Sequence, residues 1–268
     1  KDKDNYILRY NYENRLIVRM GYTYNYNSAG GTLVNNTITS NSYSIRAGFE
    51  SAGNILYGVS KMINMRKNKD GEYAILGIPY AQYLKGDFDF AKNIIIDHRN
   101  SLAFHAGIGV AVPYGNAKVV PFEKRYFSGG ANSVRGWSVR NLGPGSFAGD
   151  GNFMNQSGDI KLDASIEYRT RLFWKFRGAA FIDAGNIWTI REYENQPGGA
   201  FEFDKFYKQI AVAYGLGLRL DLDFFVLRFD GGMKAVNPKY EKTKERYPII
   251  HPKFSRDFAF HFAVGYPF

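Results

Sequence analysis

Large apolar residues alternate with small or polar residues along most of this chain, which is the period of a β-strand. In the segment 159–169, Ile160, Leu162, Ala164, Ile166 and Tyr168 share one face, and Lys161, Asp163, Ser165, Glu167 and Arg169 share the other. The alternation predicts nine strands, over residues 14–26, 42–50, 78–90, 101–112, 159–169, 174–184, 211–222, 225–233 and 258–266. We therefore expect an all-β, antiparallel fold.

The beginning of the chain is open to two interpretations. Residues Tyr6–Tyr12 form a tenth strand that turns at Glu13, which would give the even strand number of bacterial single-chain barrels. Alternatively, residues 6–26 form one long strand, because the even-numbered positions from Tyr6 onward keep phase with Leu16 and Val18. In that case the chain is only part of a barrel.

Each predicted strand has one apolar, aromatic face and one face with charges and glycine. In a soluble sandwich the apolar faces would form a shared core, whereas in a membrane barrel they would contact lipid and the charged faces would line a wet lumen. The strands have roughly the nine to eleven residues that a tilted span needs. Aromatic clusters at strand ends, such as Tyr22–Tyr26 and Tyr266–Phe268, are typical of interfacial girdles. Both features favour a transmembrane β-barrel.

The predicted connections alternate between short and long. Residues 170–175 and 222–225 are tight turns, whereas residues 113–158, 187–209 and 234–256 are long loops. Outer-membrane barrels have short periplasmic turns and long extracellular loops. This orientation makes the loop 51–77 extracellular and places Phe268 at the periplasmic rim.

The net charge of +10 first suggests nucleic-acid binding. However, Lys and Arg are spread through the chain and gather in predicted loops such as 61–69 and 239–246. We expect solvated loops that contact anionic lipid headgroups, including lipopolysaccharide, and no nucleic-acid partner. The chain has no cysteine, which excludes disulfides and thiolate metal sites, and no run of 18 apolar residues for a membrane-spanning helix.

Enzyme chemistry is poorly represented in the sequence. No common nucleophile, phosphate-binding or zinc motif is present, and the four histidines are His98, His105, His251 and His261. A barrel lipase would depend on His105 or His261. We expect no catalytic residue, no metal and no cofactor.

The long loop 113–158 contains a glycine-rich segment, Tyr126–Trp137, which ends in Val134, Arg135, Gly136 and Trp137. Its glycines allow the backbone conformations that a tight, inward-folded loop requires. We expect the loop to fold into the lumen and present Arg135 there. The alternative is a solvated loop arginine.

Strand parity places Glu167 and Asp183 on the charged faces of the two strands that follow this loop. A planar guanidinium binds carboxylates bidentately, which determines geometry as well as charge. Each such bond contributes roughly 1.5–3 kcal/mol. We expect these two carboxylates to be the partners of Arg135, in a structural lock.

The last strand carries its large residues on one face, which we expect to contact lipid: Phe258, Phe260, Phe262, Val264, Tyr266 and Phe268. The inward positions are mostly small and include Gly265, and Pro267 lacks a backbone donor. Both features favour a weak seam at this strand. The alternative is an ordinary closing strand with an aromatic girdle.

Four segments, in order, resemble the BamA/TamA superfamily of outer-membrane assembly and translocation barrels, also called bacterial surface antigens. Ser133–Trp137 resembles the VRG[FY] loop motif, Ala164–Tyr168 a strand with an inward glutamate, and Phe181–Trp188 an Asp-x-Gly-x-x-Trp strand. The terminal aromatic run resembles the insertion signal of the superfamily. The resemblance covers about residues 102–268, and Leu142–Ser146 brings it nearer to TamA-like proteins of Bacteroidetes.

The resemblance implies a 16-stranded barrel that follows POTRA domains and has a lateral seam between its first and last strands. Residues 1–268 would be a single barrel domain, without the POTRA domains and the first strands. The implied location is the outer membrane of a Gram-negative bacterium. The implied function is insertion or translocation of unfolded outer-membrane or secreted client proteins, with periplasmic or inner-membrane accessory proteins. The alternative is a passive secretion pore of the two-partner type.

Overall fold

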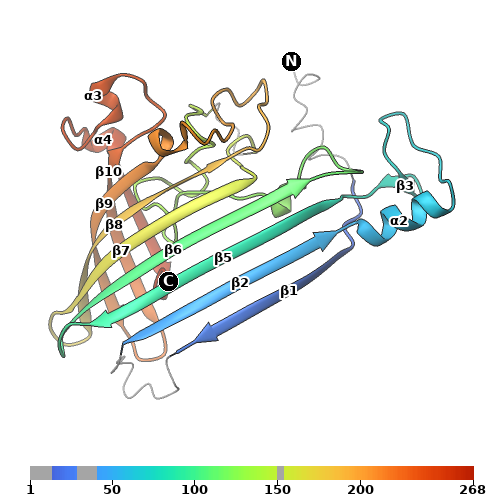
Figure 1. The fold of residues 1–268 in the computed structure, drawn as a ribbon. Coiled ribbons are helices and arrows are strands. Elements are labelled where there is room, and N and C mark those ends of the chain that lie inside the picture. Colours follow the sequence, from blue (N-terminus) through green and yellow to red (C-terminus); the bar gives the residue numbers. More distant parts are fainter. Residues whose placement is uncertain (1–13, 29–40, 150–153) are drawn as a thin grey trace.

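The computed structural model describes residues 14–28, 41–149 and 154–268, and one curved antiparallel sheet dominates them (Figure 1). Its nine strands pair in chain order: β1 (Arg19–Asn27), β2 (Ser42–Ala52), β5 (Tyr83–Ile95), β6 (Asn100–Pro113), β7 (Ile160–Arg171), β8 (Phe176–Trp188), β9 (Ala211–Asp221), β10 (Val226–Val236) and β11 (Phe258–Val264). The predicted all-β, antiparallel fold is confirmed.

Each predicted strand overlaps one strand of this sheet, but two of them begin five residues later than predicted. The strand predicted over 14–26 begins at Arg19, and the one predicted over 78–90 begins at Tyr83. The preceding residues have other partners, because Leu16 bridges Tyr80, and β4 (Ile78–Pro79) pairs with β3 (Ala74–Ile75) in a separate two-stranded sheet. The tenth strand predicted at Tyr6–Tyr12 lies outside the described residues.

The remaining elements are short and lie in the long connections. Helix α2 (Asn54–Met62) follows β2, and η1 (Phe122–Lys124) follows β6. The later connections contain η2 (Phe206–Gln209), α3 (Thr243–Arg246) and α4 (Phe254–Asp257). Across the described part of the chain, every helix is too short or too polar to cross a membrane.

Connection lengths alternate along the sheet, as predicted. Turns of four residues, 96–99, 172–175 and 222–225, join strands at one end. The opposite end carries the long connections 53–82, 114–159, 189–210 and 237–257. Successive antiparallel strands reverse direction, so these connections alternate between the two ends of the sheet (Figure 1). Residues 28–41, between β1 and β2, form a longer connection at the end with the four-residue turns.

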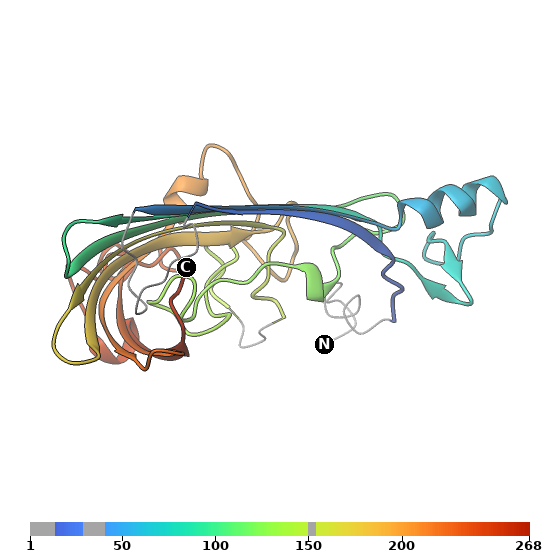
Figure 2. The ribbon, with the colours of Figure 1, turned by 90° about the horizontal axis from the view of Figure 1, so that it is seen from below.

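The two faces of the sheet differ in burial. On β7, Ile166 is 46% exposed whereas Glu167 is fully buried, and on β8 Ile182 is 55% exposed whereas Asp183 is 1% exposed. Figure 2 shows why, because the sheet curves into a trough and the described residues of the connection 114–159, drawn in green, lie within it. We call this connection the inner loop. The charged faces are thus concave and covered, and the apolar faces are convex and open.

Candidate functional site

A tight turn in the inner loop presents the predicted motif to the concave face. Gly129 and Gly130 both have φ of 95°, a conformation that side chains other than glycine rarely adopt. The backbone N–H of Gly130 donates to the carbonyl of Trp137 at 2.8 Å, which closes the turn. Residues 131–136 therefore lie within this turn.

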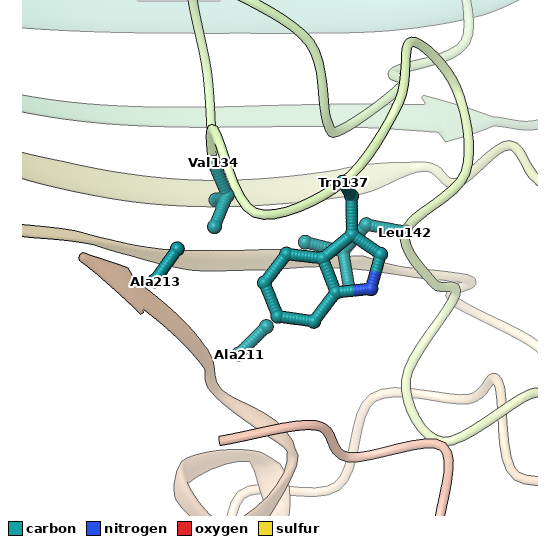
Figure 3. Packing of buried hydrophobic residues seen from close by; sticks show 5 residues of the cluster. All are labelled: Val134, Trp137, Leu142, Ala211 and Ala213. Carbon is teal, nitrogen blue, oxygen red and sulfur yellow. The ribbon is translucent and has the colours of Figure 1, made fainter. Parts of the chain in front are cut away.

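Apolar contacts attach this turn to β9. Val134 and Trp137 pack with Leu142 against Ala211 and Ala213, whose small side chains leave room for the indole ring (Figure 3). Gly136 has a different role from the predicted one, since its φ is not positive. A Cβ at Gly136 would lie 2.8 Å from the Cβ of Ala213, so glycine is needed there for close approach.

Arg135 points from this turn onto β7 and β8, where it meets both predicted carboxylates. Its Nε and Nη2 donate to the two oxygens of Asp183 at 2.7 and 2.8 Å, and its backbone N–H donates to the same carboxylate at 3.0 Å. Its Nη1 donates to Oε2 of Glu167 at 2.5 Å. The guanidinium also lies 3.5 Å from the ring centroid of Phe181, a cation–π contact.

Further charges on β9 and β10 extend this contact into a network. Arg219 donates to Glu167 at 3.1 Å and to Asp230, and Asp230 also lies 3.4 Å from both Arg135 and Arg228. We call the six residues the ion cluster: Arg135, Glu167, Asp183, Arg219, Arg228 and Asp230. Every member is at most 1% exposed. Buried charges are stable only when paired, and here three buried cations face three anions. A fourth arginine, Arg169, is 13% exposed and donates to Glu167 at 2.8 Å.

Sequence reasoning placed Arg219, Arg228 and Asp230 on the charged faces of their strands, but it did not include them in the site. Parity assigns many charged residues to the concave face, including Lys161 and Asp163. The members of the ion cluster are distinguished only by the curvature of the sheet, which brings β7 and β10 to the guanidinium of Arg135. The alternation therefore identifies these three residues as inward-facing, but it does not distinguish them from inward-facing charges outside the ion cluster.

His261 connects the inner loop to the last strand of the sheet. Its Nε2 lies 2.9 Å from the carbonyl oxygen of Arg135, and the histidine is 7% exposed. Because a carbonyl oxygen only accepts, the ring N–H donates this hydrogen bond. On β10, a Cβ at Gly232 would lie 2.1 Å from the same carbonyl oxygen. The backbone of Arg135 is thus held against β10 and β11 while its side chain is held by β7 and β8.

The end of the chain differs from the prediction. Phe258, Phe260, Phe262 and Val264 alternate with His261 as expected, and the last three are 59–63% exposed on the convex face. However, the lipid-facing positions predicted for Tyr266 and Phe268 are wrong. β11 ends at Val264, and Gly265 has φ of 87°.

Beyond Gly265 the chain turns across the concave face (Figure 2). Phe268 stacks on His105, with ring centroids 5.2 Å apart, and Arg169 lies 4.6 Å from the ring centroid of Tyr266. Alternation between faces requires a continuous strand, and the left-handed Gly265 interrupts it.

Within the described residues, no group of three histidine, aspartate or glutamate side chains could hold a metal ion. His105 lies beneath Phe268, and His261 is engaged with the inner loop. In this site a loop arginine joins residues of several strands.

The family profile of the Omp85 superfamily domain matches residues 2–268. The chain belongs to the Omp85 superfamily. Over 102 residues it is 30% identical to the outer membrane protein assembly factor BamA of Neisseria meningitidis serogroup B, a match that covers 35% of this chain and 12% of that protein.

Two solved structures are similar to the chain. BamA from Haemophilus ducreyi lacking POTRA domains 1–3 has a TM-score of 0.48 and 17% identity, over 93% of this chain and 54% of that one. CdiB from Acinetobacter baumannii has a TM-score of 0.36 and 12% identity, over 92% of this chain and 42% of that one. The chain thus spans about half of these structures and a small part of the Neisseria protein.

Family membership confirms two predictions from the sequence. The chain is part of an outer-membrane barrel protein of the BamA/TamA type, and its location is the outer membrane of a Gram-negative bacterium. The closer resemblance to TamA-like proteins of Bacteroidetes stays a prediction.

Proposed function

We propose that this chain is the C-terminal barrel part of an outer-membrane protein that inserts or translocates other proteins. In this proposal the inner loop closes the lumen of a 16-stranded barrel, and the ion cluster locks the loop in place. Clients are unfolded outer-membrane or secreted proteins, handed over by POTRA domains and accessory proteins. No cofactor, metal or enzymatic step is involved.

The observation that supports this proposal is the double attachment of Arg135. Its side chain is bound by Glu167 and Asp183, and its carbonyl oxygen accepts a hydrogen bond from His261 on β11. A shift of the loop would therefore disturb β11, which ends the sheet of the described residues. An edge strand presents unpaired backbone groups, to which a client strand can pair by β-augmentation.

Replacing Arg135 in the full-length protein tests this function. We expect Arg135→Ala to leave the protein in the membrane but to slow insertion of a client barrel into proteoliposomes. Hydrogen bonds to a charged group are worth about 1.5–3 kcal/mol each, so losing one corresponds to roughly tenfold or more in rate.

The matched control is Arg140→Ala, which removes an exposed arginine of the same loop that lies over the ring of Phe127. Its insertion rate should equal that of the unchanged protein. If Arg135→Ala and Arg140→Ala insert clients equally fast, the lock does not serve insertion.

The alternative is a passive secretion pore of the two-partner type, and electrical recording separates the two functions. A barrel whose lumen is filled by the inner loop should give a small, flickering conductance in planar bilayers. A large and steady conductance of the unchanged protein would favour the passive pore.

A further inference from the structure

Helix α2 carries an apolar stripe that faces away from the protein. Ile55, Val59 and Met62, with Ile63 directly after the helix, follow the spacing of one helical face. Their exposed fractions are 63%, 48%, 83% and 61%. The sequence predicted only a loop in this region, so the stripe was not anticipated.

A different face of α2 attaches the helix to the protein. Ser60 is buried and accepts a hydrogen bond from the hydroxyl of Tyr80 at 3.2 Å. The ring of Tyr57 meets that of Tyr73 edge-on, with centroids 5.7 Å apart. The exposed stripe is therefore not the core-facing side of the helix, which these contacts hold in a defined orientation.

The apolar stripe continues the convex face of the sheet. A groove of about 420 Å³ between α2 and the first two strands is lined by Ile55 and Leu56 together with Met20, Tyr22 and Phe49. The last three are 55–71% exposed. They lie on the convex side, because the neighbouring Gly48 pairs with Asp87, which accepts a hydrogen bond from Tyr126 of the inner loop.

Basic residues accompany the stripe. Lys61 lies on a separate flank of α2, over the ring of Tyr57, and Arg66, Lys67 and Lys69 follow the helix, all exposed. Figure 1 shows α2 beyond the strand ends, at the end of the sheet with the long connections. A helix with one apolar face and basic flanks is the kind that lies in a membrane interface, and cations attract phosphate headgroups.

We propose that α2 is an in-plane anchor in the outer leaflet of the membrane. Its stripe is inserted at the boundary between headgroups and acyl chains, and Lys61, Arg66, Lys67 and Lys69 contact lipid phosphates. The helix thereby extends the lipid-facing surface of the barrel beyond the ends of β1 and β2. This inference depends on the outer-membrane location and not on client insertion.

Labelled cysteines test the apolar half of the proposal, since the chain has no cysteine of its own. Val59→Cys and Met62→Cys report on the stripe, and Lys61→Cys on the flank is the matched control. Each full-length variant carries an environment-sensitive fluorophore in phosphatidylcholine vesicles that contain acyl-chain doxyl quenchers. We expect blue-shifted emission and several-fold stronger quenching at residues 59 and 62 than at residue 61.

Two outcomes would overturn this half. One is water-like, unquenched emission at residues 59 and 62. The other is blue-shifted emission at these residues without doxyl quenching, which would mean that protein covers the stripe instead of lipid.

Vesicles with one anionic lipid test the basic half. Adding phosphatidylglycerol should increase the quenching of the Val59→Cys label in the otherwise unchanged protein. The combined variant Arg66→Gln, Lys67→Gln and Lys69→Gln should abolish this increase while quenching in phosphatidylcholine persists. An equal increase in both proteins would show that these cations do not contact headgroups.

Discussion

Two regions of the sheet follow the same alternating pattern but bury their inward-facing charges to different extents. Between β1 and β2, Arg19 and Glu50 form an ion pair of 2.6 Å in which Arg19 is 53% exposed, although Lys124 of the inner loop also binds Glu50 at 2.9 Å. Beneath the inner loop, Arg135 and Asp183 form a pair of 2.7 Å in which both side chains are 1% exposed. The strand pattern decides which residues face inward, whereas the loop decides whether water reaches them.

The largest expected loss of stability comes from removing a charge that is buried beneath the inner loop. Asp183→Asn leaves the guanidinium of Arg135 without its bidentate partner in a site that water does not reach. Breaking a buried pair costs about 3–5 kcal/mol, so urea titration in lipid vesicles should show a loss of that order. A loss below about 1 kcal/mol would mean that water enters the ion cluster.

A substitution where the loop closely approaches the strands should cause a smaller loss in the free energy of unfolding. In Gly232→Ala the new Cβ would lie 2.1 Å from the carbonyl oxygen of Arg135, whereas at Gly86 on β5 no atom lies within 4 Å. Overpacking costs about 1–3 kcal/mol, and unconstrained sites change by about 0.5 kcal/mol or less. The same titration should separate the two alanine variants, and equal stabilities would contradict the contact at Gly232.

The link between the loop and β11 should appear as a local effect. His261→Ala removes one hydrogen bond, worth about 1 kcal/mol, which corresponds to roughly fivefold faster opening. Hydrogen exchange at the amides of Ala259 and Ala263, which lie at hydrogen-bonded positions opposite β10, should accelerate by about that factor. His98→Ala, in an exposed four-residue turn, should leave these rates unchanged; acceleration in both variants would rule out a specific link.

The smallest effect on stability is expected for the exposed ion pair between β1 and β2. Arg19→Gln removes an exposed cation, and such pairs contribute about 0–1 kcal/mol. Any loss of stability should disappear at about 1 M salt, where charges are screened within about 3 Å. A salt-independent loss as large as that of Asp183→Asn would remove the distinction between the two regions.

The end of the chain shows where sequence patterns fail. Period-two alternation through Phe268 predicted that every large residue lies on the lipid-facing side, and the large residues share the convex face as far as Val264. Beyond Gly265 the backbone leaves the sheet, and the aromatic rings meet His105 and Arg169 on the concave face. A binary pattern describes side-chain direction only while the strand lasts. Here it ends at Gly265, whose N–H still donates to Val226 of β10 but whose left-handed backbone turns the chain away from the sheet.

The sequence alone determined the strands, their order of short and long connections, and the inward direction of Arg135's partners Glu167 and Asp183. These properties are local, because the pleat sends successive side chains to opposite faces and connection lengths are read directly along the chain. The tertiary structure decided which inward charges meet. Asp230 and His261 reach Arg135, and Arg219 reaches its partner Glu167, because the sheet curves around the inner loop. Curvature is a property of all the strands together.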